Sequence, residues 1–155
     1  MTFHGDNPGV RFPPPLIYAA AIFGGWLLDQ RWPLPIGAFA GQTALAWLFF
    51  TGFVALLWSA LGWLRRNRTS MLPFRPASTL VITGPYRFTR NPMYLGAILL
   101  VLAFALWLGT WWPAILLPVV IVVVRRYVIA REERYMRRRF GAAYDDYARR
   151  VRRWI

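Results

Sequence analysis

Long stretches without a charged side chain constrain this chain more than any other feature. No Asp, Glu, Lys or Arg occurs in residues 16–28, 36–64 or 93–124. Uncharged apolar runs of about 18 residues or more are typical of membrane-spanning helices. Hydrophobic residues make up 57% of the 155 residues, which is more than a small soluble domain normally carries. The sequence therefore predicts an integral membrane protein of the all-α class, organised as a single domain over residues 1–155.

Turn-forming residues divide these stretches into about four transmembrane helices. Gly109 and Thr110 interrupt the longest stretch and predict a tight turn between two antiparallel helices. Pro33 and Pro35 predict a second turn, at which the next helix starts. A signal peptide is the alternative interpretation of the first stretch, but no small-x-small cleavage site follows it. The expected helical bundle has spans at about 16–28, 36–64, 93–108 and 111–129.

The segment that follows residue 124 is strongly charged and has an amphipathic pattern. Phe140, Tyr144, Tyr147 and Val151 recur at helical spacing among arginines. This pattern predicts a C-terminal amphipathic cytoplasmic helix that lies against the membrane surface. At the other end of the chain, residues 1–15 are polar and proline-rich, and we expect an irregular lead-in there.

The distribution of arginine predicts the orientation in the membrane. All 19 basic residues are arginine, and the formal net charge is +13. With four spans, Arg11, the loop after residue 64 and the tail share one side, and only Arg31 lies on the other. By the positive-inside rule both termini are cytoplasmic, and the arginines face anionic membrane lipids. Richness in Arg, Ala and Gly suggests a bacterial source, so we expect the bacterial inner membrane.

Composition argues against several functional classes. The arginines lie in loops that flank apolar spans, which argues against a nucleic-acid partner. There is no cysteine, which excludes disulfides, thiolate metal sites and a cysteine nucleophile. The one histidine, His4, lies in the lead-in, and there is no P-loop or Gly-rich Rossmann motif. We therefore predict no metal site, and the oligomeric state stays open.

The segment GPYRFTRNPMYLG, residues 84–96, places polar and helix-breaking residues at the cytoplasmic entrance to the third span. Pro92 suits the first turn of that helix, and Asn91 precedes it as an expected N-cap. The free amides of the helix start, together with Arg87 and Arg90, favour a carboxylate or phosphate ligand. The alternative is that these arginines only anchor the loop to lipid headgroups.

A second polar cluster, Glu132 and Glu133, follows the fourth span. Pairing with arginines on a helix surface, for example Glu133 with Arg137, is the alternative to a functional role. Because the last two spans form a hairpin, however, their ends at 91–94 and 131–133 must come close in space. The sequence thus predicts a pocket for a ligand that carries a carboxylate, hydroxyls and a positive centre.

Taken in order, these motifs resemble a known family. TGPYRFTRNPMYLG, then EE, then FGAAYDDYARRVRRWI resemble the isoprenylcysteine carboxyl methyltransferase-like membrane methyltransferases, to which the phospholipid N-methyltransferases are related. The resemblance covers roughly residues 78–155, and the first two expected spans match only in being apolar. Two positions depart from the family pattern: Asn91 stands where histidine is frequent, and Arg152 where proline is frequent.

The resemblance implies that S-adenosylmethionine binds without a Rossmann domain, between the last two spans and the tail. It implies cofactor-binding roles for Pro85, Tyr86, Arg90, Asn91, Tyr94, Gly96, Glu132 and Glu133. Charge complementarity assigns the cofactor carboxylate to Arg90 and the helix start, and ribose hydroxyls or an adenine amine to a glutamate. Arg90, Glu132 and Glu133 are also the candidate catalytic residues, because an arginine can hold an acid acceptor and a glutamate can deprotonate an amine.

The expected function is S-adenosylmethionine-dependent methyl transfer to a lipophilic acceptor at the cytoplasmic membrane face. The acceptors that stay open are a prenylcysteine carboxylate, a lipid amine such as phosphatidylethanolamine, a quinone-like lipid and a small thiol. One alternative is a sterol-reductase-like, NADPH-dependent membrane reductase, which the short chain disfavours. The other is a non-catalytic membrane scaffold whose arginines bind anionic lipid.

Overall fold

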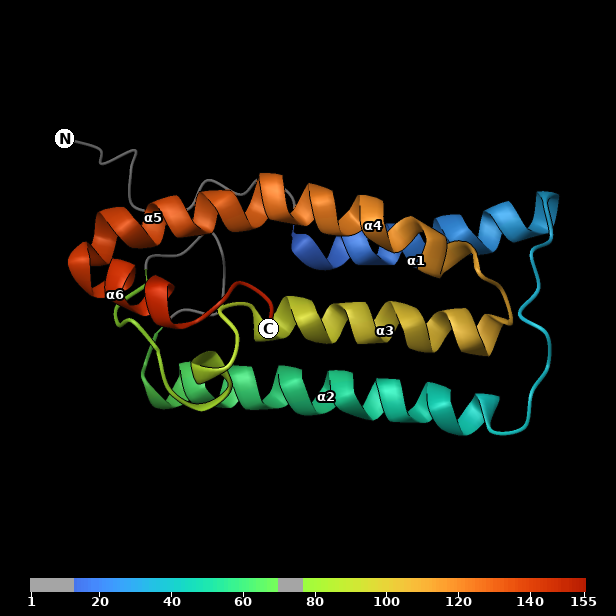
Figure 1. The fold of residues 1–155 in the computed structure, drawn as a ribbon, viewed down its shortest axis with the longest axis horizontal. Coiled ribbons are helices and arrows are strands. Elements are labelled where there is room, and N and C mark those ends of the chain that lie inside the picture. The colour runs from blue at the N-terminus through green and yellow to red at the C-terminus, as the bar shows by residue number, and fades with distance from the viewer. Residues whose placement is uncertain (1–12, 70–76) are drawn as a thin grey trace.

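The structure is an all-helical bundle, as the sequence predicts. The computed structural model describes residues 13–69 and 77–155, and within them the extended backbone pairs only at an isolated bridge. Residues 1–12, which include His4, Arg11 and most of the expected lead-in, lie outside the described residues. The long helices lie side by side (Figure 1); they are α1 Pro14–Arg31, α2 Gln42–Arg66, α3 Pro92–Leu108 and α4 Trp112–Val123.

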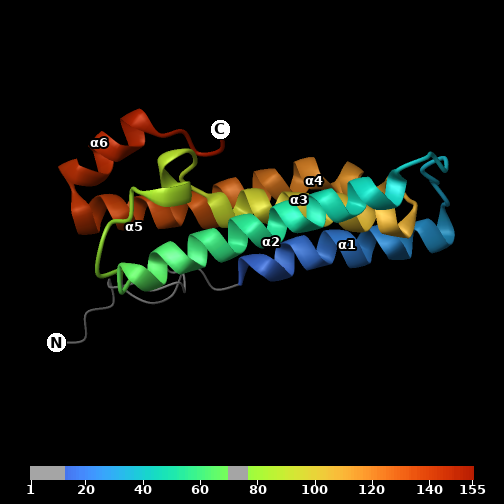
Figure 2. The same ribbon diagram turned by 90° about the horizontal axis from the view of Figure 1, so that it is seen from below.

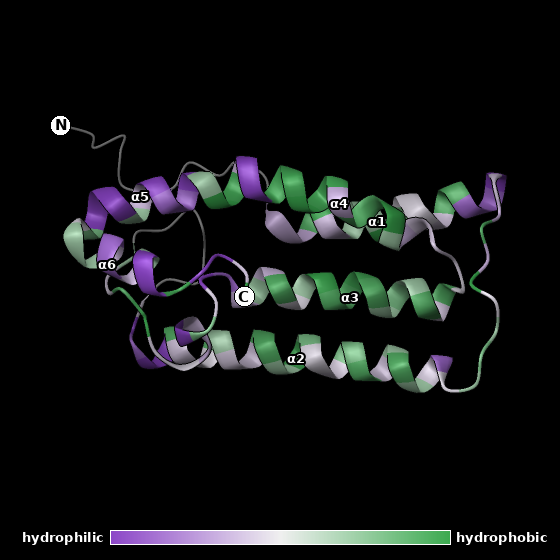
Figure 3. Ribbon diagram, viewed as in Figure 1, coloured by the Kyte–Doolittle hydropathy of each residue, from purple (hydrophilic) through white to green (hydrophobic). Residues whose placement is uncertain are grey.

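Within residues 13–69 and 77–155, two helices are long and apolar enough to cross a membrane. They are α2 and the continuous helix Trp112–Phe140, which begins with α4. α3 is apolar but has 17 residues, and α1 has 18 residues. Hydrophilic residues gather at one end of the bundle, where α2 ends and α3 begins (Figure 3), and we call it the arginine-rich end. That the chain crosses the membrane four times stays a prediction.

The second helix begins at Gln42, about two turns later than the sequence predicted. Residues 32–41 instead form an extended link, in which the amide of Ile36 donates to the carbonyl of Gly109 at 2.7 Å. Gly41 then adopts a left-handed conformation, with φ of 89°. A residue in that conformation cannot continue a right-handed helix, so α2 starts immediately after it.

The fourth helix runs well past the expected span. α4 continues into a π-helix, Val124–Ile129, and then into α5, Ala130–Phe140. At Gly141, whose φ is 53°, the chain reverses, and α6, Ala142–Arg150, returns over α5 (Figure 2). The prediction of a single amphipathic helix after residue 124 is therefore wrong. Its first part completes the fourth helix, and only its second part is a separate helix.

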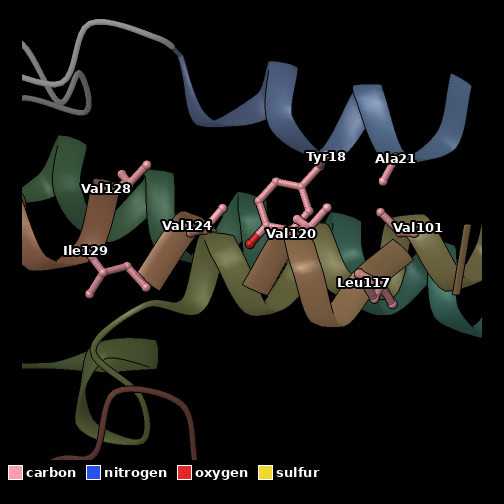
Figure 4. Close-up of a cluster of buried hydrophobic side chains, with 8 residues drawn as sticks. All are labelled: Tyr18, Ala21, Val101, Leu117, Val120, Val124, Val128 and Ile129. Atoms are coloured by element: carbon pink, nitrogen blue, oxygen red, sulfur yellow. The ribbon is translucent and has the colours of Figure 1, made fainter. Parts of the chain in front are cut away.

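The core lies where α1 packs between α3 and α4. Figure 4 shows its buried side chains: Tyr18, Ala21, Val101, Leu117, Val120, Val124, Val128 and Ile129. At Gly25 a Cβ atom would lie 2.7 Å from the Pro113 nitrogen, so α1 and α4 touch through backbone there. α2 packs along α3, where a Cβ at Gly52 would lie 3.0 Å from Leu99 Cδ1. Small residues at such contacts are typical of helices that pack within a membrane.

Candidate functional site

Several distant segments meet beside the start of α3. They are the 3₁₀ helix η1, Gly84–Arg87, the first turns of α3 and α5, and residues 151–155 after α6. The Tyr94 hydroxyl on α3 donates to Glu132 Oε1 on α5 at 2.8 Å. This contact confirms the prediction that the two ends of the hairpin come together. The tight turn at Gly109 and the start of α3 at Pro92 are also where the sequence placed them.

Glu133 is the centre of a buried ion-pair cluster. Its side chain is only 6% exposed, and its carboxylate accepts from Arg153 Nε at 2.8 Å and Nη2 at 2.6 Å. Arg90 Nη1 approaches the same carboxylate at 3.2 Å and donates to the Tyr144 hydroxyl at 3.3 Å. The alternative pairing with Arg137 is wrong, because that arginine pairs with Asp145 instead.

Glu132 has a different environment from its neighbour. Within the described residues it is paired with the Tyr94 phenol and not with a guanidinium. It lies well beyond Val124, where the apolar part of the fourth helix ends. Burial raises the pKa of Glu132 to about 7, although the Tyr94 hydrogen bond opposes the shift and the nearby Glu133 charge adds to it. A carboxyl group of this kind can take up or release a proton near neutral pH.

Two buried polar atoms at this site have no hydrogen-bond partner within the described residues: the Tyr86 hydroxyl and Arg90 Nε. Leaving such an atom unpaired costs about 1–3 kcal/mol, and native structures rarely do so without a reason. Burial also raises the pKa of Tyr86, so its phenol keeps the proton that it can donate. Together with the two carboxylates, these donors fit a polar ligand that carries both positive and negative groups.

The start of α3 is covered by the segment after α6. The Arg90 amide donates to the Arg152 carbonyl at 3.0 Å, and Asn91 Nδ2 donates to the Arg153 carbonyl at 2.9 Å. The Thr89 hydroxyl also donates to the Arg153 carbonyl, at 3.0 Å. Asn91 occupies the N-cap position but makes no side-chain capping bond. Its predicted role as a cap is therefore wrong, because the amide group is engaged by the tail.

Two further candidate residues lie at the edge of this cluster. At Gly96 a Cβ atom would lie 3.4 Å from Leu56 Cβ and from the Phe53 carbonyl, so this glycine faces α2. Pro85 contributes its carbonyl, which accepts from the Thr89 amide at 3.3 Å. The structure thus gives both residues packing and turn roles, and their contact with a cofactor stays a prediction.

A cleft of about 750 Å³ lies between the end of α2 and the η1 segment. Arg87 is the one charged residue among the described residues of its lining, and its guanidinium lies 4.6 Å from the centre of the Phe88 ring. Gly84 forms one wall, with φ of 62° and its α-carbon against the Trp63 ring. The remaining lining residues are Ala55, Leu56, Ser59, Ile82, Thr83 and Pro85.

Comparison with known proteins decides the family. The sequence model of the family described as phospholipid methyltransferase matches residues 41–143, about two thirds of the chain. The chain belongs to this family. A curated relative from Haemophilus influenzae, described as an uncharacterized protein, is 41% identical over 63 residues, which are 41% of this chain and 100% of that protein. No solved structure matches the chain.

Membership confirms the resemblance to phospholipid methyltransferases and extends it to α2, because the match begins at residue 41 and not near 78. The resemblance to the isoprenylcysteine carboxyl methyltransferase-like subgroup stays a prediction. A phospholipid methyltransferase family implies methyltransferase activity at a membrane, and the two helices that are long and apolar enough to cross one agree with an integral membrane protein. S-adenosylmethionine dependence and the identity of the acceptor stay predictions.

Three residues of the site were not predicted from the sequence. Arg153 binds Glu133, Tyr144 binds Arg90, and the Tyr147 hydroxyl donates to the Tyr86 carbonyl at 2.7 Å. Both tyrosines were expected to face the membrane surface but are 4% and 5% exposed. The available signal was the pattern itself, because two tyrosines at i and i+3 followed by arginines also suit a buried face against a charged partner.

Proposed function

We propose that this protein transfers a methyl group from S-adenosylmethionine to a lipophilic acceptor at the arginine-rich, cytoplasmic end of the bundle. One observation carries the proposal: the Tyr86 hydroxyl and Arg90 Nε lie buried beside two carboxylates and have no partner among the described residues. In a phospholipid methyltransferase family member, two unsatisfied donors beside a pair of carboxylates are suited to the methyl donor. Neither the reductase nor the scaffold alternative gains a comparable observation.

The residues of the cluster match the groups of the cofactor by charge. Arg90 suits the cofactor carboxylate, and Glu133 suits its ammonium group or its ribose hydroxyls. Tyr86 offers a phenolic donor to the same region. When bound, S-adenosylmethionine supplies a methyl group on a positive sulfur, which is already electrophilic. The protein therefore contributes mainly alignment and exclusion of water.

The two glutamates have different proposed roles, one in binding and one in proton transfer. Glu133 is held by two guanidiniums, so we assign its carboxylate to cofactor binding and not to proton transfer. In the described part of the chain, Glu132 is held by Tyr94 alone, and burial raises its pKa to about 7. It is therefore the group that can accept a proton from an amine acceptor as nitrogen attacks. An acceptor that reacts as a carboxylate would need no base, and Arg90 would orient it.

The cleft beside η1 suits the hydrocarbon tail of the acceptor. Its lining is almost wholly apolar, and it adjoins Pro85, the residue before Tyr86. Arg87 is exposed at the same place, so it can contact a phosphate or carboxylate of the acceptor headgroup. We propose that the acceptor enters from the bilayer along α2, with its reactive group directed toward Glu132.

Calorimetric titration of S-adenosylhomocysteine into the purified protein in detergent tests the cofactor assignment. We expect saturable binding, and at least about tenfold weaker binding for Arg90→Gln, which loses a charge-assisted contact. Arg150→Gln is the matched control, because this arginine is exposed on α6 away from the cluster. Absence of binding in a folded wild-type sample, or equal binding by Arg90→Gln, would reject the assignment.

A further inference from the structure

The segment 152–155 places two kinds of group on the site at once. The Arg153 guanidinium makes a two-point contact with the Glu133 carboxylate. The main-chain carbonyls of Arg152 and Arg153 accept from the Arg90 amide, the Thr89 hydroxyl and Asn91 Nδ2. A cation thus lies on the carboxylate, and oxygen atoms lie on the donors at the start of α3.

The segment thus presents a positive group and negatively polarised oxygens, as the ammonium and carboxylate of a free amino-acid moiety do. An ammonium would take the place of the guanidinium on Glu133, and carboxylate oxygens would take the place of the carbonyls at the helix start. Because the donors and acceptors are the same, the segment and such a ligand cannot occupy the site together. In the state that the structure describes, the segment therefore occupies Glu133 and the donors at the start of α3, while the Tyr86 hydroxyl and Arg90 Nε have no partner among the described residues.

The contacts of the segment are suited to exchange. α6 ends at Arg150, and no regular secondary structure holds residues 151–155. The side chain of Arg153 is 32% exposed, whereas that of Glu133 is 6% exposed, so the arginine can leave toward water while the glutamate stays. Glu133 would then still be paired with Arg90. Ile155 is 80% exposed, but Trp154 packs against the buried core cluster, so release of the segment must also break this apolar contact.

We propose that residues 152–155 are a self-ligand of the site, which must leave before an amino-acid-bearing cofactor binds. This inference rests on the proposed function. It adds a regulatory step to it: the occupancy of the site by the segment lowers the apparent affinity for the cofactor. The reduction follows from the fraction of molecules in which the segment has left, because only these bind.

The first test compares two neighbouring arginine variants. Arg153→Ala should bind S-adenosylhomocysteine about tenfold more tightly than wild type, because the closed state loses its ionic contacts. Arg152→Ala is the matched control, since its side chain is exposed and its main-chain carbonyl is unchanged; its affinity should equal that of wild type. Equal or weaker binding by Arg153→Ala would overturn the inference, because the segment would then be a wall of the site. No binding by wild type or Arg153→Ala, in folded samples, would instead reject the cofactor assignment and this inference with it.

The second test measures the segment directly. The chain has no cysteine, so a single nitroxide can be attached through Ile155→Cys. Saturating S-adenosylhomocysteine should increase the mobility of this label, as seen in its electron paramagnetic resonance spectrum. A label at Ala143→Cys, on an exposed position of α6, should show no change. Unchanged or reduced mobility at residue 155, with cofactor binding verified in the same sample, would show that the segment stays in place and would overturn the inference.

Discussion

Removal of the Glu133 carboxylate is expected to destabilise the protein strongly. In Glu133→Ala, the guanidiniums of Arg90 and Arg153 would face each other without the anion that now lies between them. Removing one partner of a buried ion pair typically costs about 3–5 kcal/mol, because the other charge is left uncompensated. The two arginine side chains differ in their access to water: that of Arg153 is 32% exposed and that of Arg90 is 12% exposed. Since Arg153 can turn to water, the lower end, about 3 kcal/mol, applies.

Thermal unfolding of the protein in detergent, followed by circular dichroism, measures this effect. For a chain of this size, about 3 kcal/mol corresponds to a melting temperature lower by roughly 6–12 °C. Asp145→Ala is the control, because Asp145 pairs with Arg137 at the surface and should change the melting temperature little. The double variant Arg90→Ala/Glu133→Ala should lose less than the sum of the single variants, by about 1 kcal/mol or more. A melting temperature within about 2 °C of wild type for Glu133→Ala, or additive single effects, would refute the reasoning.

Three further predictions concern individual residues. Burial raises the pKa of Glu132 to about 7, so the rate of methyl transfer to an amine acceptor should rise as the pH increases through about 7. Glu132→Gln should abolish this rise in a pH–rate profile. A rise that persists in the variant would show that another group is the base. Tyr86→Phe should raise the melting temperature or leave it unchanged, because it removes a buried hydroxyl that has no partner in the described part of the chain. The same variant should weaken S-adenosylhomocysteine binding in calorimetry, and a lower melting temperature or unchanged binding would contradict the assignment. Gly84→Ala should lower the free energy of unfolding by at least about 1–2 kcal/mol, because φ of Gly84 is 62° and the residue touches Trp63. Gly62→Ala is the control: no atom lies near the added Cβ, so its effect on stability should be neutral or favourable. Equal effects of the two variants in thermal unfolding would contradict the backbone argument.

Local rules predicted the hairpin that carries the site. Pro92 begins α3, and Gly109 ends it with φ of 69°, as expected for a helix-starting proline and a C-terminal glycine. Once these two residues are placed, the start of α3 and the Glu132 region must lie together. This is why Arg90, Tyr94 and the glutamate pair could be joined from the sequence.

The features that could not be predicted from the sequence depend on contacts between distant segments. The π-helix Val124–Ile129 adds one residue to a turn and shifts the faces of everything after it, and no local pattern indicates it. The reversal at Gly141 brings Arg153 back to Glu133, although the charge pattern alone allowed nearer partners. The delayed start of α2 depends on pairing between Ile36 and Gly109, which is likewise a long-range contact.

Transfer of a labelled methyl group tests the central claim most directly. Purified wild-type protein, supplied with S-adenosylmethionine carrying a tritiated methyl group and a bacterial lipid extract, should place label in the organic phase. Arg90→Gln should place much less label there, whereas Arg150→Gln, a surface variant, should match wild type. No label in any extracted fraction, from folded wild-type protein with S-adenosylmethionine bound, would contradict the assignment of this protein as a methyltransferase of lipophilic acceptors.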